Sequence, residues 1–174
     1  AGEKALVFTG AMDYWPNVDA VQWFCDDVFP ALRTQDPALR FYIVGSRPNP
    51  QVQALGQLPG VTVTGTVPDV RPYIRHATLA VAPLRIARGI QNKVLEAMAM
   101  GTPTVVSPQA LEGIDAVPDQ ELAVADGAPA WIAALGAMLA RSNRDMGRAA
   151  RARVEHHYSW PSNLACIEER LECS

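Results

Sequence analysis

Hydrophobic positions along this 174-residue chain form two patterns: short continuous apolar runs, and longer segments with helical spacing between them. A continuous run of four to eight apolar residues is typical of a strand that is buried on both faces of a sheet. We therefore predict strands over residues 5–10, 41–45, 61–65, 78–83, 102–107 and 121–126.

Helical spacing is clearest in residues 17–33, where Asn17 follows Pro16 and is predicted as the N-cap. Apolar residues recur there at intervals of three and four, namely Val18, Val21, Phe24 (or Cys25), Val28 and Leu32. Further helices are predicted over residues 50–58, 69–77, 89–101, 128–141, 143–157 and 160–172.

The alternation of strands and helices predicts an α/β fold: a Rossmann-like three-layer domain with a parallel sheet of about six strands between helices. The length favours one domain over residues 1–174. Because crossovers in such sheets are right-handed, the loops that leave the strands meet at the carboxyl edge, where ligands bind. The loops of interest are therefore 10–17, 45–50, 65–69, 83–90 and 107–113.

Composition excludes several classes of function. The net charge is −3 without a block of like charge, which argues against nucleic acid as a partner. No apolar run approaches the roughly 20 residues of a membrane span, so we expect a soluble, cytoplasmic protein. Cys25, Cys166 and Cys173 fit no metal-ligand spacing, and we predict neither a metal nor a cofactor.

Common nucleotide-binding and hydrolase signatures are missing. The first predicted strand is followed by "GAMDYWPN", which is not the G-x-G-x-x-G of dinucleotide-binding proteins. Neither a P-loop nor a G-x-S-x-G motif occurs. The binding chemistry must therefore come from a less generic segment.

That segment is 85–96, "RIARGIQNKVLE", which leads from a strand end into a helix. A helix N-terminus presents unpaired N–H groups and partial positive charge, which suit an anion. Gly89 allows a ligand to approach the backbone closely. Arg85, Arg88 and Lys93 add three cations within nine residues, so we predict a diphosphate site here.

Lys93 and Glu96 share one side of this predicted helix with Met100, since each residue turns the helix by about 100°. A carboxylate one turn inside a phosphate site can accept two hydrogen bonds from a vicinal diol such as a ribose. The alternative is an ordinary surface pair, because Lys and Glu three residues apart on a helix are common. Spacing alone leaves both interpretations open.

The segment "GIQNKVLEAMAMGTPTVVS" (89–107) resembles the nucleotide-sugar-binding half of retaining GT-B glycosyltransferases of glycosyltransferase group 1. Its most specific part is "LEAMAxGxPxV". The resemblance extends to "FTGAMDYWPNVDAVQWF", "FYIVG", "VTVTGTVPDVRPYIRHATLAVAPLR" and "YSW", and thus to nearly the whole chain. It is closest to sugar transferases of bacterial exopolysaccharide systems.

The resemblance implies roles for particular positions. In this family a Glu-x7-Glu motif precedes a strand; its second glutamate binds ribose and falls on Glu96. The first contacts the transferred sugar, and its position is Arg88, which leaves the donor sugar in question. Most members also carry an Arg and a Lys after the first strand, whereas here Ala11 follows Gly10 and "GAMDYWPN" contains neither.

The implied donor site lies at the carboxyl edge of the sheet. The base would lie against the loop around Gly65–Val67, and backbone N–H groups at the start of the helix would face the diphosphate. Positive charge would come from Arg85, Arg88 or Lys93. The predicted donor-binding residues are Gly10, Gly65, Val67, Arg85, Arg88, Gly89, Ile90, Lys93 and Glu96, while no catalytic residue is assigned.

A GT-B enzyme has two Rossmann-like domains, and this chain resembles the second. The resemblance implies a partner in the missing N-terminal acceptor domain, reached by a helix over 158–174, and an inactive 174-residue chain in isolation. The family's active-site histidine belongs to the missing domain, so surface or structural roles are expected for His76, His156 and His157.

The implied reaction is transfer of a hexose, with retention, from a nucleotide-diphosphate sugar to a saccharide or lipid-linked acceptor. UDP and GDP are the expected nucleotides, and the full-length protein is compatible with peripheral membrane association. Two alternatives stay open: a nucleotide-sugar epimerase of the same architecture, and a degenerate, non-catalytic nucleotide-binding module.

Overall fold

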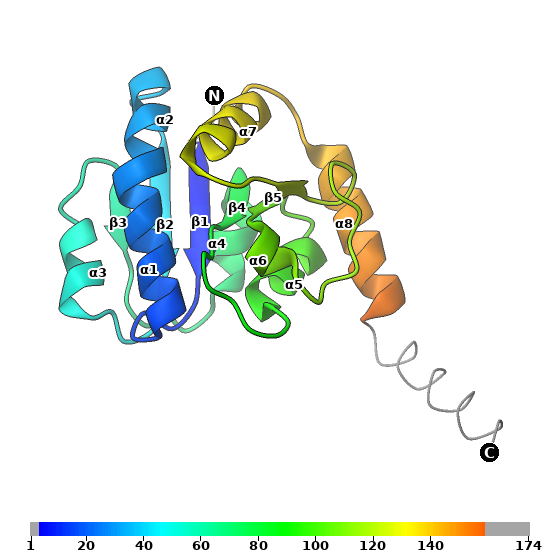
Figure 1. Cartoon of the computed structure of the whole chain (residues 1–174), viewed down its shortest axis with the longest axis horizontal. Coiled ribbons are helices and arrows are strands. Elements are labelled where there is room, and N and C mark those ends of the chain that lie inside the picture. The colour runs from blue at the N-terminus through cyan, green and yellow to red at the C-terminus, as the bar shows by residue number, and fades with distance from the viewer. Residues whose placement is uncertain (1–3, 159–174) are drawn as a thin grey trace, which may run out of the picture.

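The computed structural model describes residues 4–158 and shows one parallel sheet between helices (Figure 1). All strand pairings are parallel, in the order β3-β2-β1-β4-β5-β6. The strands are β1 (Ala5–Thr9), β2 (Arg40–Val44), β3 (Val61–Val63), β4 (Leu79–Ala82), β5 (Thr104–Val106) and β6 (Ala123–Val124). The predicted six-stranded α/β fold is confirmed, and each strand lies inside its predicted range or within one residue of it.

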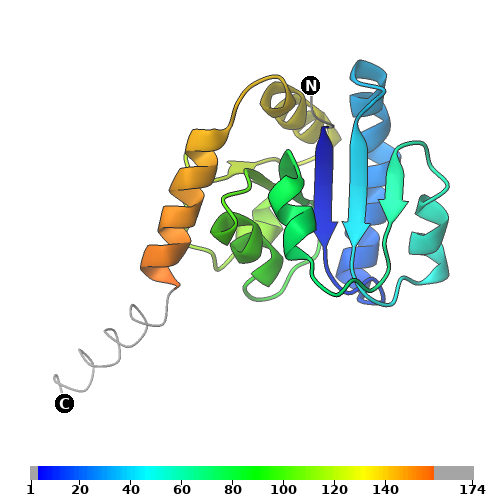
Figure 2. The ribbon, with the colours of Figure 1, turned by 180° about the vertical axis from the view of Figure 1, so that it is seen from behind.

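Helices cover both faces of the sheet. In Figure 1, α1, α2 and α7 lie in front of the strands, and Figure 2, seen from behind, shows α4 and α5 on the opposite face. The helices are α1 (Trp15–Trp23), η1 (Phe24–Val28), α2 (Phe29–Gln35), α3 (Pro50–Leu55), α4 (Arg71–His76), α5 (Asn92–Ala99), α6 (Pro108–Leu111), α7 (Ala128–Leu139) and α8 (Arg144–His157). The short α6 was not predicted, and the predicted helices over 158–174 and 160–172 lie outside the described residues apart from Tyr158.

The first long helix differs from the prediction in two ways. Helix α1 begins at Trp15 with Tyr14 as N-cap, so the prediction that Asn17 is the cap is wrong. The cause is Pro16, which is favoured at the first helical positions because it has no N–H to leave unpaired. A π-helical turn, η1, precedes Pro30, whose ring clashes with the carbonyl four residues back in a regular α-helix.

The predicted apolar stripe of this helix is buried. Val18, Val21, Phe24, Val28 and Leu32 are all at most 2% exposed. Cys25 packs beside them, and burial raises the pKa of its thiol to about 12. The first helix is therefore held by the core on this side of the sheet, and its thiol is an inert packing residue.

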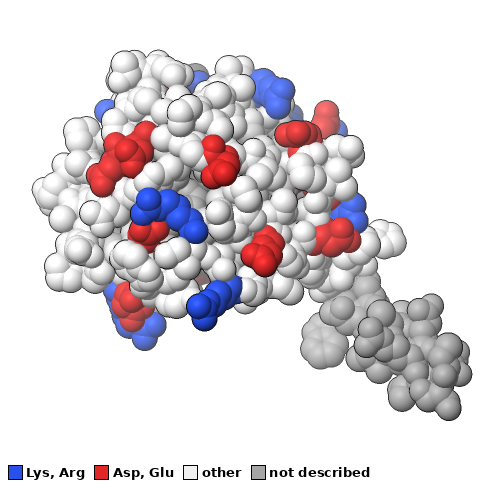
Figure 3. All heavy atoms as spheres, in the orientation of Figure 1, with Lys and Arg blue, Asp and Glu red and all other residues white. Residues whose placement is uncertain are grey.

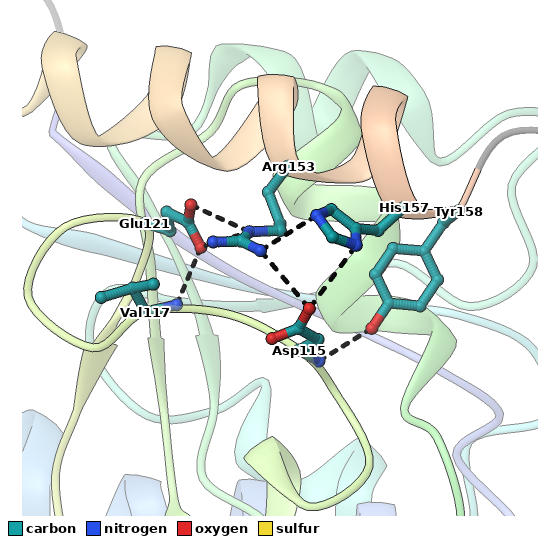
Figure 4. A network of polar contacts seen from close by, with 6 residues as sticks. All are labelled: Asp115, Val117, Glu121, Arg153, His157 and Tyr158. Carbon is teal, nitrogen blue, oxygen red and sulfur yellow. Dashed lines mark hydrogen bonds and ion pairs between the residues drawn. The ribbon is translucent and has the colours of Figure 1, made fainter. Parts of the chain in front are cut away.

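A polar network ties α8 to the loop that precedes β6 (Figure 4). The Arg153 Nε lies 3.0 Å from both carboxylate oxygens of Glu121, and its Nη1 lies 3.3 Å from Asp115 Oδ2. The Tyr158 hydroxyl accepts a hydrogen bond from the Asp115 N–H at 2.8 Å, and His157 Nδ1 lies 3.5 Å from Asp115 Oδ2. His157 therefore has a structural contact at the end of the described chain.

Charged side chains are mixed on the surface. On the face seen in Figure 3, positive and negative groups alternate without a broad basic area. No helix within residues 4–158 is long and apolar enough to cross a membrane.

Candidate functional site

A cleft of about 570 Å³ opens at the carboxyl edge of the sheet. Its walls come from the loops that follow β1, β2, β3 and β4 and from the first turns of α5. The strand order reverses between β1 and β4, which is where open α/β sheets bind ligands. Six of the predicted donor-binding residues line the cleft: Gly10, Val67, Arg88, Ile90, Lys93 and Glu96.

The floor of the cleft is backbone, because the ends of β1 and β2 approach each other closely. The Gly10 N–H donates to the Val44 carbonyl at 3.0 Å, and the Met12 N–H donates to the Ser46 carbonyl at 2.8 Å. A Cβ added at Gly45 would lie 1.7 Å from the Gly10 carbonyl oxygen. Only glycine fits there, and both Gly10 and Gly45 line the cleft.

Lys93 extends from α5 toward the end of β1 and is largely buried. Its Nζ donates to Asn17 Oδ1 at 2.5 Å and lies 4.8 Å from the centroid of the Phe8 ring. Desolvation lowers the pKa of Lys93 from 10.5 to about 8, and the charge of Glu96 offsets part of this shift. No described carboxylate lies within ion-pair distance of the ammonium, so the charge of Glu96 compensates it only in part and an anion in the cleft would stabilise the charged form.

The N-terminus of α5 faces the same cleft. Gln91, the N-cap, and Asn92, the first helical residue, both line it, and no described side chain caps this end. Its first amides therefore add partial positive charge beside Lys93. Arg88 also lines the cleft and is exposed.

Glu96 lies one turn further along α5 than Lys93 and also lines the cleft. The two residues do share one side of the helix, as their spacing predicts. No ion pair within 4 Å joins them in the described part of the chain, although the charge of Glu96 acts on Lys93, so the surface-pair interpretation stays open beside the ligand-binding one. The exposed Glu96 carboxylate is available to accept hydrogen bonds from a ligand.

Two predicted glycines lie beside the cleft and do not line it. Gly65 has φ +69° and Gly89 has φ +70°, and a Cβ at either would meet no heavy atom within 4 Å. These glycines serve left-handed turns, whereas their neighbours Thr66 and Ile90 supply the lining. The expected approach of a ligand to the Gly89 backbone stays a prediction.

Arg85 lies away from the cleft and is paired with a carboxylate. Its Nε lies 2.9 Å from Asp19 Oδ2, and its Nη2 also contacts the Asp19 carboxylate. The guanidinium carbon lies 6.0 Å from the centroid of the Trp23 ring. Arg85 lines a separate cavity of about 280 Å³ together with Trp131 and Asp126. Its placement does not support the predicted role in holding the diphosphate.

Sequence reasoning missed several residues of the site: Gly45, Ser46, Gln91 and Asn92 also line the cleft, and two further contributions come from the segment after β1. Asn17, predicted as a cap, instead bonds Lys93, and Tyr14 lines the cleft from the loop after β1. Both lie in loop 10–17, which the strand pattern had marked as interesting, but nothing in the local sequence indicates the contact with α5. Within residues 4–158, no cluster of three or more His, Cys, Asp or Glu side chains could hold a metal ion.

Comparison with known families bears on this arrangement. The family model described as "Glycosyl transferases group 1" matches residues 3–141. The chain belongs to this family. No curated protein matches the group 1 chain in sequence.

Solved structures with the same fold are similar to this group 1 domain. Sucrose-phosphate synthase from Thermosynechococcus elongatus has a TM-score of 0.75 at 20% identity, over 98% of this chain and 46% of that one. Anabaena HepE, in complex with UDP and glucose, has a TM-score of 0.76 at 13% identity, over 98% and 48%. The C-terminal domain of the group 1 protein LpcC from Francisella tularensis has a TM-score of 0.72 at 14% identity, over 91% and 88%.

These likenesses establish the architecture of the group 1 domain. Its Rossmann-like α/β fold is that of a domain of GT-B glycosyltransferases. The chain spans about half the length of the first similar structures, and nearly the whole length of an isolated C-terminal domain.

Proposed function

We propose that this group 1 domain binds the nucleotide-sugar donor of a retaining glycosyltransferase, which transfers a hexose to a saccharide or lipid-linked acceptor. One observation carries the proposal: a largely buried Lys93 ammonium without an ion-pair partner among the described residues and an exposed Glu96 carboxylate line a single cleft one helical turn apart. The family match supports sugar transfer, and a similar structure in complex with UDP and glucose supports UDP as the nucleotide.

Each part of the donor has a complementary group in the cleft. The diphosphate lies against Lys93 and the first amides of α5, with Arg88 at its side. The ribose hydroxyls donate to Glu96. The base lies against Thr66 and Val67 after β3. Positive charge and N–H groups stabilise the leaving diphosphate, so the proposal requires no metal ion.

The acceptor side belongs to a second domain in this proposal, because the chain spans about half of similar structures. Four apolar side chains on the loops after β1 and β4 and at the start of α1 are 47–60% exposed: Tyr14, Trp15, Ile86 and Ile90. A facing domain would cover them and exclude water from the reaction. The exopolysaccharide role is part of the proposal and rests on the resemblance in sequence, and the cytoplasmic location stays a prediction.

Calorimetric titration of the 174-residue chain with UDP, GDP and ADP tests donor binding. We expect a Kd between tens of micromolar and millimolar, about −4 to −6 kcal/mol. Glu96→Ala and Lys93→Ala should each weaken binding by about tenfold. Lys4→Ala and Glu155→Ala are matched controls, because Lys4 lies at the opposite edge of the sheet and Glu155 pairs with Arg151 on α8. Equal effects of site and control variants would refute the assignment.

A degenerate binding module is the second candidate, and Arg88 at the position of the family's first glutamate favours it. Such a module would bind nucleotide without turnover. A protein that contains this chain and an acceptor domain separates the possibilities: a glycoside product supports the transferase, an epimerised free donor supports an epimerase, and binding without product supports the module.

A further inference from the structure

Asn17 is a buried polar side chain that links the first turn of α1 to the cleft. It is 4% exposed, and both ends of its amide are used. The Oδ1 accepts from Lys93 Nζ at 2.5 Å, and the Nδ2 donates to the Ala11 carbonyl at 2.9 Å. The second bond fixes which end of the amide faces the ammonium.

Close packing holds this contact at the end of β1. A Cβ at Gly10 would lie 2.7 Å from Asn17 Nδ2 and 3.3 Å from Lys93 Nζ. Because glycine leaves this space open, the ammonium lies beside the Gly10 backbone on the cleft floor. Loop 10–17 itself contains neither Lys nor Arg, so Lys93 brings positive charge to a loop that has none of its own.

The chemistry of an amide differs from that of a carboxylate at this place. Two residues further along α1, the buried Asp19 pairs with Arg85 and neutralises it. Asn17 accepts a hydrogen bond from Lys93 but carries no charge, so it orients the ammonium and leaves its charge uncompensated. Within one turn of α1, the carboxylate of Asp19 thus neutralises Arg85, whereas the amide of Asn17 holds Lys93 without neutralising it.

Resting on the donor-binding function above, we propose that Asn17 is a positioning residue for nucleotide binding. Its amide fixes the Lys93 ammonium on the cleft floor beside Gly10 and leaves its positive charge free to pair with the donor diphosphate. Arg88 and Glu96 are the other charged groups that line the cleft, and of these the carboxylate of Glu96 acts on Lys93 through its charge.

The first test needs no nucleotide. The chain contains two lysines, Lys4 and Lys93, so lysine labelled with ¹³C at Cε gives two signals, and the one missing in Lys93→Arg belongs to Lys93. Asn17→Asp places a carboxylate against the ammonium and should raise the pKa of Lys93 by one unit or more. Asn49→Asp is the matched control, because Asn49 caps α3 through its side chain and aspartate caps equally well; it should leave the Lys93 titration unchanged.

The second test is a double-mutant cycle with UDP. Asn17→Ala should weaken UDP binding about three- to tenfold in the wild-type chain and less than twofold in the Lys93→Ala chain, because Asn17 acts through Lys93. Asn17→Asp should weaken it at least tenfold at pH 7, while Asn49→Asp leaves it within twofold. Heat denaturation identifies variants that do not fold. If Asn17→Asp does not fold, the UDP-binding result of Asn17→Ala alone decides the test.

The outcomes separate the two proposals. Weaker UDP binding in Lys93→Ala but not in either Asn17 variant would overturn the positioning role and leave the donor site intact. Additive losses in the cycle would show that Asn17 acts independently of Lys93, which also overturns it. Absence of UDP binding to the wild type, with Asn17→Asp still shifting the Lys93 titration, would overturn the donor site and with it any role of Asn17 in nucleotide binding.

Discussion

Nucleotide binding should depend on pH through Lys93. The pKa of Lys93 is lowered to about 8 in the unliganded protein, chiefly by desolvation. A bound diphosphate should raise this pKa, because its negative charge favours the charged form of the lysine. Only the charged form pairs with the diphosphate. About nine-tenths of Lys93 is charged at pH 7 and about one-tenth at pH 9, so UDP affinity should fall about tenfold across this range. The phosphates of UDP do not change charge there, because their last proton leaves near pH 6.

Calorimetry in two buffers with different ionisation enthalpies measures both the affinity and the proton taken up. The wild type should take up close to one proton at pH 9 and little at pH 7. In Lys93→Arg the guanidinium stays charged across the range, so the affinity of that variant should be constant. A wild-type affinity that does not change between pH 7 and 9, or an equal fall in Lys93→Arg, would refute the assignment of Lys93 to the diphosphate.

Three further substitutions test other contacts. Gly45→Ala places a Cβ 1.7 Å from a carbonyl oxygen at the end of β1 and should lower the free energy of unfolding in urea by more than about 3 kcal/mol; a loss below 1 kcal/mol would contradict this. Arg85→Ala leaves the carboxylate of Asp19 unpaired and should cost about 1–3 kcal/mol while UDP affinity stays within twofold; a tenfold loss of affinity would place Arg85 at the ligand. Arg153→Met removes both bonds to Glu121 and should cost about 1–3 kcal/mol, visible as a lower Tm; an unchanged Tm would show that this network does not stabilise the fold.

The fold was predictable from the sequence because parallel strands covered on both faces are apolar throughout, and such runs are short and recognisable. Their order along the chain then placed the carboxyl-edge loops and, with them, Lys93 and Glu96. Both side chains lie within one turn of the same helix, so helical geometry alone decided that they share a side. Local periodicity was sufficient for these features.

Contacts between distant segments were not predictable in the same way. Arg85 and Arg88 are three residues apart, yet Arg85 points away from the cleft because Asp19, 66 residues earlier, holds its guanidinium. Asn17 followed a proline and fitted the pattern of an N-cap, yet its partner is Lys93, 76 residues away. A local pattern indicates what a side chain can do, whereas the tertiary fold decides which partner it meets.

The environment of Lys93 that suits it to binding an anion also lowers the stability of the unliganded protein. An ammonium removed from water without a carboxylate partner destabilises the unliganded protein, and the lowered pKa of Lys93 expresses that cost. Arg85 shows that the same helix can neutralise a cation when a carboxylate is in place. At Lys93 an amide accepts the hydrogen bond and brings no negative charge, so in the proposed donor site the ligand supplies the group that pairs with the ammonium. The diphosphate of a nucleotide sugar is such a group, and its binding would recover the stability that the unliganded cleft gives up.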